Sequence, residues 1–207
     1  MRPTEAELQK DKEDASAWAA SYLADPDTVY IDTETTGILS RNPDTEIVQI
    51  AITNWQGRPL LVSMIKPTMG IPEEVSNIHG ITEETVAGCP TFTDIFPLIR
   101  QILRGKNVIV YNADFDWKLL ATEVKRRGEA KLNSASVHCA MDQYARWVGE
   151  WSDKKSDYKW QKLPNLSGRV AHDAHVDCDS LHLLLQKMAN LPDEQSNLSA
   201  EEIDLDF

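Results

Sequence analysis

Short apolar runs along the chain predict five β-strands. The runs are rich in β-branched and aromatic residues and are bounded by Gly, Pro, Asn and Asp, as strands usually are. They fall at residues 28–31, 46–55, 59–66, 108–111 and 137–141. A short turn at Gln56–Gly57 joins the second run to the third, so these two are expected to form a hairpin. The fourth run is apolar throughout, which is typical of a buried strand.

Apolar residues at helical spacing predict helices around these strands. Residues 4–24 form the first, with Thr4 as its N-cap, and residues 93–103 form a clear later one. Two further helices each begin with an acid in line with the apolar row. Asp116 precedes Leu119, Leu120 and Val124, and Asp177 precedes Leu181, Leu184, Leu185 and Met188. A carboxylate that faces the core costs free energy unless it is paired or binds a metal ion.

Two more acids lie where the first strand ends, just before the turn expected at Thr35–Gly37. Because strand side chains alternate, Asp32 and Glu34 project from the same face. Two carboxylates about 4 Å apart repel by about 4 kcal/mol at an effective dielectric of about 20, and a divalent cation would remove that cost. Hard cations such as Mg²⁺ bind oxygen ligands and often use one or two carboxylates. The alternative interpretation is a solvated strand end.

Composition places the chain among globular proteins: 207 residues, 42% hydrophobic and 26% charged, suit one well-buried domain. No apolar run is long enough to span a membrane and the N-terminus does not resemble a signal peptide, so a cytoplasmic protein without membrane contact is expected. Cys89, Cys139 and Cys178 lack a CxxC pair, so neither a disulfide framework nor a zinc site is predicted. The formal charge of -12 argues against a nucleic-acid coat protein, but not against an enzyme that holds nucleic acid through metal ions.

Three motifs, in this order, resemble the DEDDh 3'-to-5' exonucleases, a group that includes the bacterial proofreading subunit DnaQ, RNase T and many phage and bacterial exonucleases. The motifs are Asp32-Thr33-Glu34-Thr35-Thr36-Gly37, Asn112-Ala113-Asp114-Phe115-Asp116 and His172-Asp173-Ala174-His175-Val176-Asp177, and Ile78-His79-Gly80-Ile81-Thr82 also matches. The resemblance covers residues 28–190 and implies an α/β, ribonuclease H-like exonuclease fold with a five-stranded mixed sheet flanked by helices. Residues 1–27 are then an N-terminal helical extension, and residues 191–207 are an acidic C-terminal tail.

Carried over residue by residue, the resemblance implies a metal-dependent active site. Asp32, Glu34, Asp116 and Asp177 would bind two divalent ions, Mg²⁺ or Mn²⁺, and His172 would be the general base that activates a water. The residues expected at the terminal nucleotide are Thr35, Thr36, Gly37, Ile38, Leu39, His79, Asn112 and Phe115. His175 departs from the family pattern, which has one histidine in this motif, and it leaves a second candidate for the base.

The implied function is 3'-to-5' hydrolysis of single-stranded or frayed DNA, which releases nucleoside 5'-monophosphates during replication or repair. RNA trimming by the same chemistry stays open, because the sequence does not distinguish the two substrates. A non-catalytic docking subunit is a further alternative, although such a copy would have no reason to keep four inward acids.

Two internal segments carry marked charge patterns. Residues 151–162 alternate lysines with aromatics, which suits binding of single-stranded nucleic acid. The alternative is that the aromatics belong to the core and the lysines are solvated. Lys125-Arg126-Arg127 is interpreted as the charged end of a helix.

Residues 191–207 hold six acids and no Lys or Arg, and they lack the apolar surface to fold alone. Their ending, Ile203-Asp204-Leu205-Asp206-Phe207, resembles the acidic tip of single-stranded-DNA-binding proteins, which docks into basic pockets of repair and replication partners. The resemblance implies such a partner, or a contact with residues 154–162 of the same chain. A solvated tail is the alternative.

Overall fold

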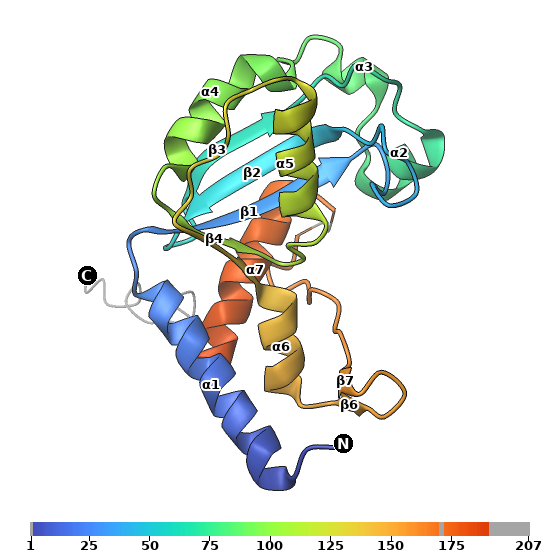
Figure 1. The fold of residues 1–207 in the computed structure, drawn as a ribbon. Helices are drawn as coiled ribbons and strands as arrows, with labels where there is room; N and C mark the ends of the chain where they lie inside the picture. Colours follow the sequence, from blue (N-terminus) through green and yellow to red (C-terminus); the bar gives the residue numbers. More distant parts are fainter. Residues whose placement is uncertain (1, 170–171, 191–207) are drawn as a thin grey trace, which may run out of the picture.

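The computed structural model describes residues 2–169 and 172–190, so the acidic tail lies outside the described residues. A five-stranded sheet of order β3-β2-β1-β4-β5 forms the centre, with helices on both faces (Figure 1). The strands are β1 Thr28–Thr35, β2 Ile47–Asn54, β3 Pro59–Met64, β4 Asn107–Val110 and β5 Ser136–Cys139, with a separate two-stranded pair, β6 Trp151–Ser152 and β7 Asp157–Tyr158. The helices are α1 Glu5–Leu23, α2 Glu73–His79, α3 Glu83–Val86, α4 Phe92–Leu103, α5 Asp116–Arg126, α6 Ala140–Val148 and α7 Ala174–Met188.

The sheet is mixed, as the resemblance implies. β2 runs antiparallel to both β1 and β3, whereas β1, β4 and β5 are parallel. The predicted hairpin joins β2 to β3, and Gly57 in its turn adopts φ +75°. A Cβ there would lie 3.1 Å from the ring of His182, so the turn packs closely against α7.

Each face of the sheet has its own apolar cluster, because strand side chains alternate between faces. Val29 and Ile31 point toward α4 and α5 and join one buried cluster with their apolar residues. Tyr30 points the other way and joins a second cluster with α1 and α7. The even-numbered positions of β1 therefore face α7, and this parity decides where Asp32 and Glu34 lie.

The predicted helical rows are buried as expected. Leu119, Leu120 and Val124 of α5 are 5% exposed or less, and Leu181, Leu184, Leu185 and Met188 of α7 are at most 1% exposed. Thr4 caps α1 in a capping box with Glu7. Among the described residues, no helix is long and apolar enough to cross a membrane.

Several predicted boundaries differ from the structure. The fifth strand ends at Cys139, because Ala140 and Met141 begin α6, and the third ends at Met64. β1 does not end at a turn over Thr35, because a bulge after Glu34 lets Thr35 pair with Ile47 of β2. Helix α4 begins one residue earlier than expected, because Thr91, not a later residue, accepts the backbone N–H of Asp94 and caps it.

Candidate active site

The end of β1 brings its two acids to the face of the sheet that α7 covers. Asp32 pairs with Ala51 and Glu34 with Gln49 of β2. Both carboxylates are partly buried. They therefore sit between the sheet and the first turn of α7, where a solvated strand end would instead leave them in water.

Asp116 is the first residue of α5 and reaches the same place from the end of β4. Its side chain is 5% exposed. The hydroxyl of Thr33, on the opposite face of β1, donates to Asp116 Oδ1 at 2.7 Å. The backbone turn before it is closed by the Asn112 carbonyl, which accepts from the N–H groups of Phe115 and Asp116.

Asp177 enters from the first turn of α7, and two residues that were not among the expected site residues, Asp173 and Gln49, fix that turn. Asp173 caps the helix by accepting from the N–H groups of His175 and Val176. Gln49, the cross-strand neighbour of Glu34, donates to Asp173 at 3.0 Å and accepts from the N–H of Ala174 at 3.0 Å. A buried polar side chain on β2 therefore docks the start of α7 beside the acids of β1.

His172 lies with these acids. One ligand atom from each of Glu34, His172 and Asp177 falls within 4.8 Å of the other two. His172 is exposed and adopts φ 63°, a left-handed conformation that is uncommon for residues other than glycine and is often found at functional sites. The loop conformation, and not a shared helix face, brings His172 to Asp177.

The carboxylates raise one another's pKa. For Asp32 the pKa is well above its ordinary value because of burial, and next because of the charges of Asp116, Asp177 and Glu34. Burial and nearby acids raise the pKa of Glu34 to about 8. Burial also raises the pKa of Asp116 to about 6, although the Thr33 hydrogen bond opposes the shift. A cation bound among these carboxylates would offset their mutual repulsion and lower their pKa values.

His175 is placed differently from His172. Its Nε2 lies 3.7 Å from Asp179 on the same helix. The guanidinium of Arg169 also pairs with Asp179. Of the two histidines in the motif, His172 is the one grouped with Glu34 and Asp177.

The end of β1 and the loop that follows it hold five of the residues expected at a terminal nucleotide, Thr35 to Leu39. Thr35 and Thr36 are buried, and their hydroxyls bond to the Gly37 carbonyl and the Glu46 N–H respectively. Leu39 packs against the core, whereas Ile38 is 42% exposed. Contact with a substrate would therefore come from backbone groups of the loop and from the Ile38 side chain.

His79 supports this loop from α2. Its Nε2 lies 3.2 Å from the Thr35 carbonyl, and its Nδ1 accepts from the N–H of Ile81 at 3.0 Å. Nδ1 is therefore unprotonated and Nε2 carries the hydrogen that is donated to Thr35. Burial lowers the pKa of His79, and the bond to Thr35 opposes that shift.

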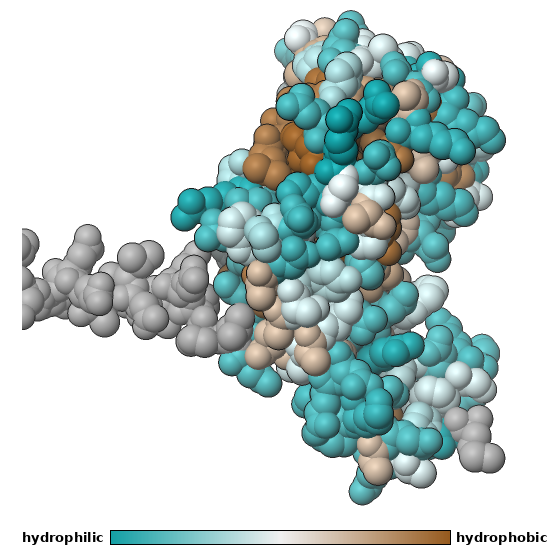
Figure 2. Space-filling view, turned by 60° about the vertical axis from the view of Figure 1, so that its left-hand side comes forward, coloured by the Kyte–Doolittle hydropathy of each residue, from teal (hydrophilic) through white to brown (hydrophobic). Residues whose placement is uncertain are grey.

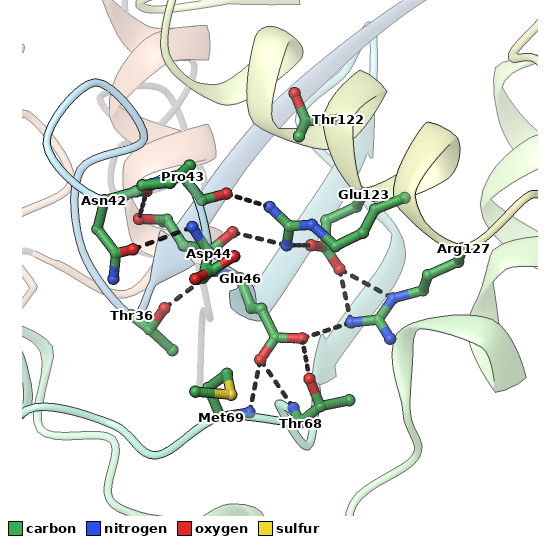
Figure 3. A network of polar contacts seen from close by, with 12 residues as sticks. Thr36, Asn42, Pro43, Asp44, Glu46, Thr68, Met69, Thr122, Glu123 and Arg127 are labelled. Carbon is green, nitrogen blue, oxygen red and sulfur yellow. Dashed lines mark hydrogen bonds and ion pairs between the residues drawn. The ribbon is translucent and has the colours of Figure 1, made fainter.

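The two arginines at the end of α5 hold the same loop, contrary to their interpretation as a solvated helix end (Figure 3). Arg126 donates to the carbonyls of Pro43 and Thr45 at 2.6 and 3.1 Å. Arg127 donates to Glu46 and to Glu123 at 2.6 and 2.9 Å. These two glutamates are 2% and 0% exposed, and ion pairs that are this well buried are costly to break from one side.

We expect Arg126→Ala to loosen residues 38–45. The substitution removes both bonds to the loop carbonyls but leaves Arg127 to neutralise Glu123. Amide hydrogen exchange at Arg41, Asn42 and Thr45, whose N–H groups bond within the loop, should accelerate by about tenfold or more. Lys125→Ala, at an exposed position of the same helix end, is the matched control. Equal exchange in both variants would contradict this role of Arg126.

Residues 151–162 were expected either to bind single-stranded nucleic acid or to place their aromatics in the core, and the structure shows one aromatic of each kind. Tyr158 is buried and donates to Asp11 of α1 at 2.6 Å, so it belongs to the core. Trp160 is 63% exposed, and the ammonium of Lys155 lies 4.8 Å from its ring centroid. A surface aromatic with a cation beside it remains available to a nucleic-acid base.

Comparison with known proteins shows similarity to an exonuclease family and to two named relatives. A family model described as an exonuclease family, RNase T, matches residues 29–184. An uncharacterized exonuclease of Escherichia phage 186 is 37% identical over 173 residues, which cover 77% of this chain and 86% of that protein. The DNA polymerase III subunit epsilon of Treponema pallidum is 26% identical over 159 residues, covering 75% of this chain and 71% of that one.

Solved structures resemble the fold at lower identity. Exonuclease X, in complex with 5' overhanging duplex DNA, has a TM-score of 0.51 at 24% identity and covers 81% of this chain and 96% of that one. E. coli Exonuclease I, in complex with a dA16 oligonucleotide, has a TM-score of 0.62 at 17% identity and covers 79% of this chain and 42% of that one. Both share the α/β fold of this chain.

Proposed function

The chain belongs to the RNase T exonuclease family, and we propose from this premise that it hydrolyses DNA strands from their 3' ends and releases nucleoside 5'-monophosphates. The observation that carries the proposal is the convergence of β1, α5 and α7, where nearby carboxylates raise one another's pKa and His172 is grouped with Glu34 and Asp177. Mutual repulsion among these carboxylates destabilises the metal-free protein. A binding module would gain nothing from retaining them.

The donor set fits divalent metal ions. Asp32, Glu34, Asp116 and Asp177 offer only oxygen ligands, which is the preference of Mg²⁺ and Mn²⁺, and their raised pKa values reflect charge that a cation would neutralise. We propose that these four acids hold two such ions. When bound, the ions supply positive charge that stabilises the phosphoryl group and both oxygens of an in-line displacement.

The protein's own groups perform the remaining steps. His172, in contact range of Glu34 and Asp177, accepts the proton of the attacking water. The backbone at Thr35–Gly37 and the side chains of Ile38 and Phe115 hold the terminal nucleotide. Leu39, His79 and Asn112 act indirectly, by supporting the core, the Thr35 carbonyl and the turn into α5.

DNA is the proposed substrate because relatives of this chain are named as DNA polymerase III subunits and structural neighbours were solved with DNA. The direct test is to incubate the protein with Mg²⁺ and 3'-labelled single-stranded DNA or RNA in parallel. We expect label release as mononucleotide, faster from DNA. Faster release from RNA would instead assign RNA trimming. A replication or repair partner that binds residues 191–207 stays a prediction.

We expect a 3'-phosphate to slow degradation sharply, whereas a 5'-phosphate should have little effect. The proposed site holds the terminal 3'-hydroxyl beside the loop after β1, and a phosphate there would add negative charge next to the carboxylates. The measurement is the initial rate on otherwise identical oligonucleotides with either end phosphorylated. Cleavage of circular single strands, which have no end, would contradict this polarity.

A further inference from the structure

Strand β3 leaves an apolar stripe in solvent. Leu60, Val62 and Met64 are 45%, 44% and 37% exposed. Val62 and Met64 occupy alternate positions and share one face of the sheet, the face on which Ala51, the partner of Val62, packs toward α7. Leu60 lies beside them, at the point where the register between β2 and β3 shifts by one residue. Figure 2 shows an apolar area in a surface that is otherwise largely hydrophilic. We call these three residues the β3 stripe.

The stripe lies on an edge of the sheet whose backbone is open. Within residues 2–169 and 172–190, β3 pairs with β2 alone. The open stretch ends at Lys66, where the backbone bonds to Pro90 and pairs with Thr91. An uncovered edge with apolar side chains is a template for another strand, and natural proteins usually cover or charge such edges.

Basic residues flank the stripe at both ends. Arg58 precedes β3 and Lys66 follows it, and both are exposed. If two copies paired antiparallel through β3 around Val62, Arg58 of one copy would lie near Lys66 of the other. Like charges that approach one another across two strands are destabilising, so an acidic strand suits this edge better than a second copy of β3.

The end of the chain has the complementary pattern. Ile203, Leu205 and Phe207 alternate with acids, and Glu201 continues the same parity. As a strand, residues 201–207 would present one acid and three apolar side chains on one face and further acids on the other. Along the sequence, the spacing of these three apolar residues is the same as that of Leu60, Val62 and Met64.

We propose that residues 201–207 add to the open edge of β3 as a sixth strand of the sheet. Ile203, Leu205 and Phe207 cover Leu60, Val62 and Met64, with Leu205 against Val62 in either strand direction. Glu201 then lies near Arg58 if the strands are parallel, or near Lys66 if they are antiparallel. Backbone hydrogen bonds supply affinity, and alternate side chains supply the register.

The connecting chain is long enough for this contact within one molecule. His182 of α7 lies against Gly57, next to the start of β3, and Asn190 is about 12 Å further along the helix direction. Residues 191–200 span up to about 35 Å when extended. The contact leaves the acids of β1 uncovered, because β2 separates β1 from β3.

Hydrogen exchange of the full-length protein tests the proposal without any need for catalysis. Peptides that cover β3 should exchange about tenfold faster in Leu205→Asp than in the unmodified protein. Ser199→Asp adds the same charge outside the segment and should leave exchange unchanged. A synthetic peptide of residues 198–207, added in excess to Leu205→Asp, should restore protection. Val62→Asp, which changes the strand instead of the tail, should abolish this rescue.

Each alternative gives a distinct result. Equal exchange of β3 in the unmodified protein and Leu205→Asp would overturn the proposal. Protection that depends on protein concentration, together with a dimeric mass in light scattering, would assign the edge to a second copy instead. Protection that is independent of concentration, lost in Leu205→Asp and restored by the peptide would support an intramolecular sixth strand.

Discussion

Asp32→Asn is expected to abolish hydrolysis while raising the free energy of unfolding of the metal-free protein. The amide cannot supply a charged ligand, so turnover in Mg²⁺ should fall by about 10³-fold. Stability should rise because the substitution removes one charge from a buried group of like charges. Initial rates and urea denaturation in EDTA measure the two effects. Asp114→Asn, which changes an exposed acid of the second motif, is the matched control.

The stability gain should depend on pH in a definite direction. The pKa of Asp32 is raised in the folded state, and that of Glu34 is raised to about 8. Above the ordinary carboxyl range the folded protein therefore binds more protons than the unfolded chain, and its stability falls as pH rises toward about 8. In Asp32→Asn this fall should be shallower. A variant with near-normal turnover, or with lower metal-free stability than Asp114→Asn, would contradict the assignment.

His172→Ala is expected to lower turnover by about 10² to 10⁴-fold, the usual contribution of a general base. The structure groups His172 with Glu34 and Asp177, so its loss leaves the attacking water without a proton acceptor. Apparent affinity for the oligonucleotide should change little. Single-turnover rates with saturating Mg²⁺ separate the chemical step from binding.

His175→Ala is the matched control for His172. Its ring lies beside Asp179, and Arg169 still pairs with Asp179 after the substitution. Turnover should therefore stay within a few-fold of the unmodified protein. Equal losses in the two variants, or a larger loss for His175→Ala, would assign the base to the other histidine.

Helix α5 connects the candidate ligands to the loop that would hold the substrate. Asp116 is its first residue, and Arg126, its last, bonds to the Pro43 and Thr45 carbonyls. A helix of this length is rigid, with about 1.5 Å of rise per residue. Helix α5 therefore connects Asp116 to the loop over residues 38–45, although its two arginines lie outside every motif.

The sequence by itself determined the parts of this protein that follow from backbone periodicity. Alternation along β1 placed Asp32 and Glu34 on one face, and helical spacing placed Asp116 and Asp177 in line with buried rows. These relations depend only on residues close together in the chain, because the repeat of a strand or a helix is fixed by its dihedral angles. Family resemblance then supplied the sheet that connects them.

Only the tertiary structure decided the contacts between residues far apart in the chain. Gln49 docks the first turn of α7, and Arg127 pairs with Glu46 across 81 positions. No local pattern distinguishes these residues from solvated polar ones, because their partners are set by how the sheet and helices pack. The same holds for the β3 stripe. Its apolar alternation predicts a buried face, and it is exposed because β3 lies at the sheet's edge, beyond the part of that face that α7 covers.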